Sequence, residues 1–233
     1  MMNILITGAG RGLGYELVAE ALKQGHGVIA GVRRPDQEQT ALSQLAATYG
    51  DKLTIAALDV TDEEGIAALA GSLQEQGRTL GAIINNAAVL SARDTTIEAL
   101  DFQDVLTTMD INLYGPMRVI KHFLPLLTEP EGSVINISSE AGSITNAYAN
   151  DYPYGISKAG LNMFTQQLHM YVKERGIQVL SVHPGWIQTD MGGAEAPTNP
   201  SQSAAGILEL IEKRTMPEGH FMFVDYTGKD MKI

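Results

Sequence analysis

The stretch Thr7-Gly8-Ala9-Gly10-Arg11-Gly12-Leu13-Gly14 decides how the rest of the sequence is interpreted. The apolar run Ile4-Leu5-Ile6 precedes it and predicts a buried strand, while a segment of helical period follows it. A dinucleotide pyrophosphate needs a tight turn, close approach of the backbone, and a helix N-terminus whose N–H groups point at the anion. Gly8, Gly12 and Gly14 suit these roles, because a Cβ atom would block the turn or the approach. The position between a strand and a helix favours a phosphate-binding turn over an ordinary tight turn.

The rest of the chain alternates short β-branched runs with longer segments of helical period. The predicted strands are residues 4–7, 28–32, 53–58, 82–85, 133–138, 179–183 and 221–224. The predicted helices are residues 13–24, 37–49, 62–76, 101–127, 154–175 and 201–213. Because parallel strands need crossover connections, this order predicts an α/β Rossmann fold: a doubly wound parallel sheet of about seven strands with helices on both faces. No linker or repeat interrupts it, so one domain is expected over residues 1–233.

Composition argues against several classes of protein. The absence of cysteine excludes disulfide bonds, a thiolate zinc site and a cysteine nucleophile. His26, His122, His169 and His220 show no ligand spacing, so no metal is expected. A net charge of −11 argues against a nucleic-acid surface, which needs a basic patch. No run approaches the roughly 20 apolar residues that cross a bilayer, and no signal-like segment precedes the first strand. A cytoplasmic protein without membrane contact is therefore expected.

The pattern Thr-Gly-x-x-x-Gly-x-Gly at residues 7–14 resembles that of the short-chain dehydrogenases/reductases. His183-Pro184-Gly185-Trp186-Ile187-Gln188-Thr189-Asp190-Met191 and the terminal Phe-x-Phe-Val-Asp-Tyr-x-Gly resemble a narrower branch, the C-factor-like and sniffer-like carbonyl reductases. The resemblance covers essentially the whole chain. It implies that Ile187 and Thr189 hold the nicotinamide carboxamide, that Asp59-Val60 contacts adenine, and that Asn86-Ala87 lies along the cofactor.

The end of the second predicted strand indicates which nicotinamide cofactor is bound. An acidic residue there accepts a hydrogen bond from the ribose 2′-hydroxyl of NAD, but Val32 occupies the corresponding place and Arg33 follows it. Arg11, in the glycine turn, matches the basic residue of NADP-preferring relatives. Two guanidinium groups suit a 2′-phosphate in geometry and charge, so NADP(H) is the expected cofactor.

The catalytic residues are predicted from a tyrosine–lysine pair and from the polar residues that accompany it in the sequence. Tyr154 and Lys158 are four residues apart, which places both on one helix face. A phenol with an ordinary pKa of about 10 exchanges protons poorly at neutral pH, and a nearby ammonium is expected to lower that pKa. The resemblance assigns Ser139 to the substrate oxygen, with Ser138 as the alternative, and implies that Asn112 holds a water linking Lys158 to solvent. The interval from Ser139 to Tyr154 is slightly longer than is usual in the family.

These residues together predict hydride transfer from NADPH to an aldehyde or ketone, with Tyr154 as the proton donor. The main alternative is an NADP(H)-binding sensor with little turnover; a biosynthetic ketoreductase acting on a carrier-bound substrate is a third interpretation. The segment 191–200 carries Gly, Pro and small polar residues and is predicted to be a substrate lid. The resemblance also implies a homodimer or homotetramer that pairs through helices 101–127 and 154–175.

Overall fold

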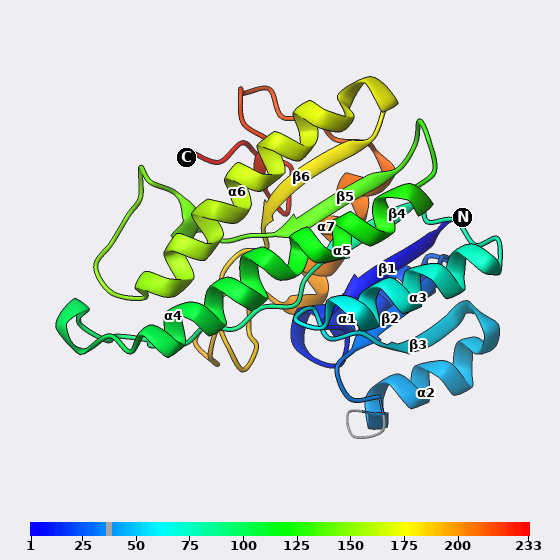
Figure 1. The fold of residues 1–233 in the computed structure, drawn as a ribbon, viewed down its shortest axis with the longest axis horizontal. Helices are drawn as coiled ribbons and strands as arrows, with labels where there is room; N and C mark the ends of the chain where they lie inside the picture. Colours follow the sequence, from blue (N-terminus) through cyan, green and yellow to red (C-terminus); the bar gives the residue numbers. More distant parts are fainter. Residues whose placement is uncertain (36–38) are drawn as a thin grey trace.

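A parallel sheet of seven strands runs through the part of the chain that the computed structural model describes, residues 1–35 and 39–233. The strand order is β3-β2-β1-β4-β5-β6-β7 (Figure 1). The strands are β1 (Asn3–Thr7), β2 (Gly27–Val32), β3 (Leu53–Ala57), β4 (Ala82–Asn85), β5 (Ser133–Ile137), β6 (Gln178–His183) and β7 (Phe223–Asp225). Chain order reverses direction in the sheet between β1 and β4, so this is the point where ligands bind in open α/β sheets.

Helices cover both faces of the sheet (Figure 1). They are α1 (Gly12–Lys23), α2 (Gln39–Tyr49), α3 (Glu63–Glu75), α4 (Phe102–Met109), α5 (Gly115–Phe123), α6 (Tyr152–Val172) and α7 (Pro200–Glu212). Apolar residues of α1, α2 and α7 form one buried layer, and those of α3, α5 and α6 form the other. The predicted fold class, a doubly wound Rossmann fold, is confirmed; the predicted start of the second helix at residue 37 lies outside the described residues.

The central strands carry runs of consecutive apolar residues because both of their faces are buried. In β1, Ile4 and Ile6 pack into the layer of α1 and α7, while Leu5 packs into the opposite layer. All three side chains are fully buried. Continuous apolar runs, rather than alternating ones, are therefore what this sheet requires.

The predicted helix over residues 101–127 is wrong, since the chain forms two helices there. A π-helical turn, Asp110–Tyr114, separates α4 from α5, and a 3₁₀ turn, Leu124–Leu126, ends the segment. Pro116 has no N–H to donate to the carbonyl of Asn112, as an α-helix would require. Instead, the N–H of Gly115 donates to the carbonyl of Asp110, which closes the wider turn. The last strand also shifts from the predicted 221–224 to Phe223–Asp225.

The glycine turn is packed tightly against the end of β4. A Cβ atom at Gly14 would lie 2.1 Å from the Gly8 carbonyl oxygen and 2.6 Å from Nδ2 of Asn86. Gly8 has a φ of +64°, and a Cβ there would lie 2.8 Å from Cα of Ala87. The hydroxyl of Thr7 accepts hydrogen bonds from the N–H groups of Asn86 and Ala87. These contacts place the N-terminus of α1 at the carboxyl edge of the sheet.

We expect Gly14→Ala to lower the free energy of unfolding by about 1–3 kcal/mol, because the added methyl has no space. The matched control is Gly71→Ala in α3, where a Cβ meets nothing within 4 Å. That change should raise stability by up to about 1 kcal/mol, through the better helix propensity of alanine. Urea unfolding of both variants measures the difference, and equal effects at the two sites would contradict the packing described for Gly14.

Candidate active site

A cleft of about 1310 Å³ opens at the carboxyl ends of the central strands. It lies between the glycine turn, the loops that follow β4, β5 and β6, and the first turns of α6. Of the predicted site residues, its wall contains Gly8, Gly10, Arg11, Gly12, Leu13, Gly14, Arg33, Asp59, Val60, Asn86, Ala87, Ser139, Tyr154, Lys158, Ile187 and Thr189. Residues from seven separate segments of the sequence therefore meet in one cavity.

Two predicted site residues, Ala9 and Asn112, lie behind the wall. Ala9 is fully buried and its N–H donates to the carbonyl of Gly31. Asn112 is buried in the π-helical turn, where its side chain exchanges two 2.9 Å hydrogen bonds with the backbone of Val89. Its Nδ2 also donates to the Ser157 hydroxyl at 3.1 Å. Asn112 thus ties the loop after β4 to α6 and contributes to the cleft indirectly.

The glycine turn has the features that a dinucleotide pyrophosphate requires. Glycines stand where the backbone of the turn would come closest to the pyrophosphate, and the first turn of α1 carries no acidic side chain. The exposed N–H groups at this helix end favour an anion. The side-chain amide of Asn86 is used within the protein, because its Nδ2 donates to the carbonyls of Thr7 (2.9 Å) and Gly8 (3.1 Å). The residues present therefore fit a dinucleotide, with Asn86 bracing the turn.

Lys158 is buried at 2% exposure beside Tyr154. Its Nζ donates to the carbonyl of Ile137, at the end of β5, at 2.7 Å and lies 5.5 Å from the centroid of the Tyr154 ring. Burial disfavours the charged form and lowers the pKa of Lys158 to about 7. The Lys158 amine therefore lies in the wall of the cleft beside the Tyr154 phenol. Because its pKa is close to neutral pH, a small change in its surroundings decides whether it is charged.

Tyr154 differs from the sequence expectation in the direction of its pKa shift. Burial raises the pKa of Tyr154, a side-chain hydrogen bond with Ser139 lowers it, and the Asp151 carboxylate adds a smaller increase. Lys158 was expected to lower it, but the Lys158 Nζ is directed at the Ile137 carbonyl. The phenol is consequently protonated at neutral pH, which is the form that can donate a proton.

The two candidate serines point in opposite directions. Ser138 is 1% exposed and its hydroxyl donates to Oδ1 of Asn162 at 2.7 Å, behind the sheet edge. Ser139 faces Tyr154, and its Oγ accepts a 3.2 Å hydrogen bond from the N–H of Ala141. The long interval up to Tyr154 contains a 3₁₀ turn, Glu140–Gly142, and a left-handed residue at Asp151, where φ is +48°. The geometry therefore favours Ser139 as the residue available to a substrate.

Several cleft residues were not singled out from the sequence. Nδ1 of His183 accepts from the N–H of Glu140 at 3.2 Å, next to Ser139, and Arg93 donates to the Met191 carbonyl at 2.6 Å. The Tyr148 hydroxyl donates to Asp151 at 3.3 Å. The contacts of His183 and Arg93 join loops that are distant in the sequence, so no local spacing signals them, whereas Tyr148 and Asp151 belong to one loop.

The cleft, its glycine turn and the Ser139–Tyr154–Lys158 group together define a dinucleotide-binding protein of the α/β class. The short chain dehydrogenase family model matches residues 2–200. The chain belongs to the short-chain dehydrogenase/reductase family of oxidoreductases.

Three similar proteins cover nearly all of the chain. The 1-hydroxy-2-glutathionyl-2-methyl-3-butene dehydrogenase of Rhodococcus sp. is 32% identical, over 97% of this chain and 98% of that protein. The NADPH-bound carbonyl reductase from chicken fatty liver is 33% identical with a TM-score of 0.88, covering 99% and 98%. The carbonyl reductase Sniffer of D. melanogaster is 30% identical with a TM-score of 0.91, covering 100% of both chains. The resemblance to the sniffer-like branch is thereby confirmed.

Exchanging each serine for alanine should separate a structural from a catalytic role. Ser138→Ala removes a buried hydrogen bond to Asn162 and should cost about 1–2 kcal/mol of unfolding free energy. Ser139→Ala should leave stability nearly unchanged but lower kcat about 100-fold, as expected for loss of an oxyanion donor. Chemical unfolding and turnover with a reduced nicotinamide cofactor measure the two effects. Loss of turnover in Ser138→Ala alone would assign the role to Ser138.

Proposed function

We propose that the chain reduces the carbonyl group of a small aldehyde or ketone with NADPH. The observation that carries this proposal is the group formed by Ser139, Tyr154 and Lys158 in the wall of a cleft with a phosphate-binding turn. Burial raises the pKa of Tyr154, so its phenol is protonated at neutral pH and has a proton to give. Turnover requires this proton donor, whereas a sensor that only binds NADP(H) does not.

NADP(H) is the proposed cofactor because positive charge lies where its 2′-phosphate would be recognised. Val32, Arg33 and Arg11 all line the cleft, and no carboxylate replaces Val32 at the end of β2 to repel a phosphate. Leu58, Asp59 and Val60 follow β3 and would border the adenine. The chicken carbonyl reductase with bound NADPH supports the same assignment.

A cofactor held by the glycine turn, Arg11 and Arg33 would supply the hydride that reduces the carbonyl carbon. The Tyr154 hydroxyl gives its proton to the carbonyl oxygen, and the Ser139 hydroxyl donates a hydrogen bond to the same atom. Lys158, whose Nζ lies 5.5 Å from the centroid of the Tyr154 ring, would stabilise the phenolate that forms when it carries its own proton. We propose that the Asn112 carbonyl, which has no donor at residue 116 because that residue is proline, holds a relay water beside Lys158.

The substrate end of the cleft combines apolar and small groups. Tyr148, Trp186 and Met191 line it, and Trp186 is 56% exposed. We propose that the segment 191–200 closes over this end as a lid. Its first residue accepts from Arg93, and the N–H of Gln188 donates to the Thr198 carbonyl, which joins the two ends of the loop. These surroundings favour a small, partly apolar carbonyl compound over a carrier-bound substrate.

Tyr154→Phe tests the proposed reaction. The variant should bind NADPH as the wild type does but lose at least about 1000-fold in kcat, because the proton donor is gone. Loss of NADPH absorbance with a panel of aldehydes, quinones and diketones measures kcat, and fluorescence titration measures binding. If the wild type binds NADPH but reduces no member of the panel, the sensor becomes the better interpretation.

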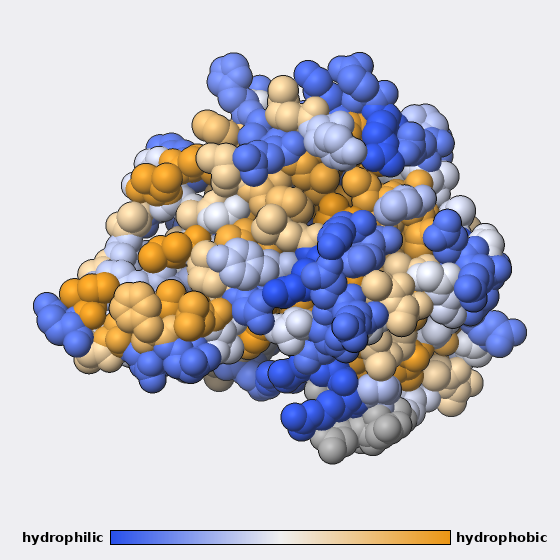
Figure 2. All heavy atoms as spheres, in the orientation of Figure 1, coloured by the Kyte–Doolittle hydropathy of each residue, from blue (hydrophilic) through white to orange (hydrophobic). Residues whose placement is uncertain are grey.

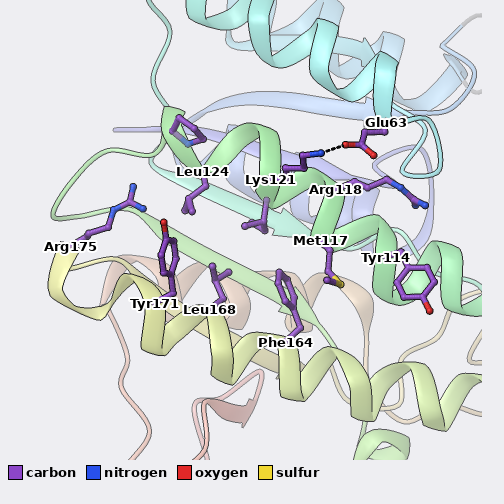
Figure 3. A pocket seen from close by; sticks show the side chains of 12 residues that line it. Glu63, Tyr114, Met117, Arg118, Lys121, Leu124, Phe164, Leu168, Tyr171 and Arg175 are labelled. Atoms are coloured by element: carbon purple, nitrogen blue, oxygen red, sulfur yellow. Dashed lines mark hydrogen bonds and ion pairs between the residues drawn. The ribbon is translucent and has the colours of Figure 1, made fainter.

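A second copy of this chain is the proposed partner for the face made by α4, α5 and α6. Phe102, Leu106 and Met163 are each more than half exposed on α4 and α6, and Figure 2 shows apolar surface gathered over α4. Between α5 and α6, a hollow of about 690 Å³ is lined by Met117, Phe164 and other residues (Figure 3). An apolar face of this extent is typical of a homodimer interface.

Met163→Glu should shift this dimer toward monomer, because a charge would be buried at the interface. Sedimentation velocity over a range of protein concentrations measures the shift. Met216→Glu, which alters another methionine that is more than half exposed and lies after α7, is the matched control and should leave the oligomeric state unchanged. A wild type that sediments as a monomer at all concentrations would refute the dimer.

A further inference from the structure

Two charged residues join the walls of the cleft above the phosphate-binding turn. Arg11 directly precedes α1, and Asp190 lies in the loop after β6, next to Thr189. Nη1 of Arg11 donates to Oδ2 of Asp190 at 2.6 Å. The walls also approach each other beside this pair, since a Cβ atom at Gly12 would lie 3.5 Å from Cγ2 of Thr189. Arg11 and Asp190 both line the cleft.

Arg11, the residue expected to bind the 2′-phosphate, is therefore engaged by a carboxylate. A guanidinium binds carboxylates and phosphates through the same planar set of donors, so the two anions compete for it. Within the described residues, the Asp190 carboxylate has no hydrogen-bond partner other than Arg11. Asp190 is thus free to give up this contact without loss of another.

We propose that Asp190 is a specificity-determining residue that competes with the cofactor's 2′-phosphate for Arg11 and so lowers the preference for NADPH over NADH. This inference rests on the proposed function, in which Arg11 binds that phosphate. NADH carries no 2′-phosphate and leaves the Arg11–Asp190 pair intact, whereas NADPH must break it. The competition is modest, because the two side chains are 78% and 80% exposed and exposed ion pairs are weak.

A carboxylate that merely repelled the cofactor would affect NADH as well, through its pyrophosphate, and would not need Arg11.

The test is a comparison of dissociation constants for NADPH and NADH. Trp186, the one tryptophan of the sequence, lies in the cleft wall, so energy transfer from its indole to the reduced nicotinamide reports binding of either cofactor. The variants are Asp190→Asn, Arg11→Ala and the double variant, which together form a mutant cycle. Glu195→Gln is the matched control, since it removes the same charge from the same loop. Thermal unfolding verifies that each variant is folded.

Asp190→Asn should tighten NADPH binding about two- to five-fold, the range that an exposed ion pair supports, and leave NADH binding unchanged. Arg11→Ala should weaken NADPH binding about ten-fold or more, and Asp190→Asn should have no further effect in that background. Glu195→Gln should change neither constant.

Four results would overturn the inference. Equal tightening of both cofactors, or tightening that persists without Arg11, would show that Asp190 acts by general repulsion. An unchanged NADPH constant in Asp190→Asn, with the Arg11→Ala loss intact, would reject the competition and leave the proposed function standing. An unchanged NADPH to NADH ratio in Arg11→Ala would instead remove Arg11 from the proposed cofactor site, and the competition with it.

Discussion

The absence of space at Gly14 is the constraint on which the rest of the structure depends. The first turn of α1 lies so close to the Gly8 carbonyl and to Asn86 that no side chain fits between them. This contact joins β1 to the end of β4 across the point where the sheet reverses its order. It also directs the N-terminus of α1 into the cleft. A helix displaced by the width of a methyl group would point its N–H groups elsewhere.

A buried polar network holds the opposite wall of the cleft. Oδ1 of Asn162 accepts from the hydroxyls of both Ser138 and Ser181, and its Nδ2 donates to the Gly142 carbonyl. The network links β5, β6 and the turn after Ser139 to α6, the helix that carries the candidate proton donor. Burying so many polar groups is favourable only because each has a partner. Such a network gives the loop that bears Ser139 one position rather than several.

The sequence predicts those parts of the site that depend on local spacing. The glycine turn and the Tyr154–Lys158 pair follow from short intervals on a strand–helix boundary and on one helix face, and the structure brings both into the cleft. The strand order and layers follow from apolar runs and crossover connections. The sequence does not predict the π-helical turn, because the helical periodicity continues through Pro116. The interruption between α4 and α5 depends on how this turn packs against its neighbours.

Other features could not be predicted because distant residues decide them. The resemblance assigns the substrate contact to Ser139 with Ser138 as the alternative, and only the position of Asn162 shows that the Ser138 hydroxyl is already engaged in a buried hydrogen bond. The contact of Arg93 with Met191 joins two loops across the cleft. The direction of the Tyr154 pKa shift depends on burial and on where Lys158 points, neither of which spacing reveals.

The pairing of β1 with β4 has a consequence for how the protein folds. The glycine turn is synthesised before its bracing residue Asn86, which follows only after three intervening strands and their helices. Contacts that are so distant along the chain form late and slowly. During synthesis, the turn must wait unbraced until β4 has emerged and inserted beside β1. The cofactor can therefore bind only after the centre of the sheet has formed, which makes cofactor binding a late event in folding.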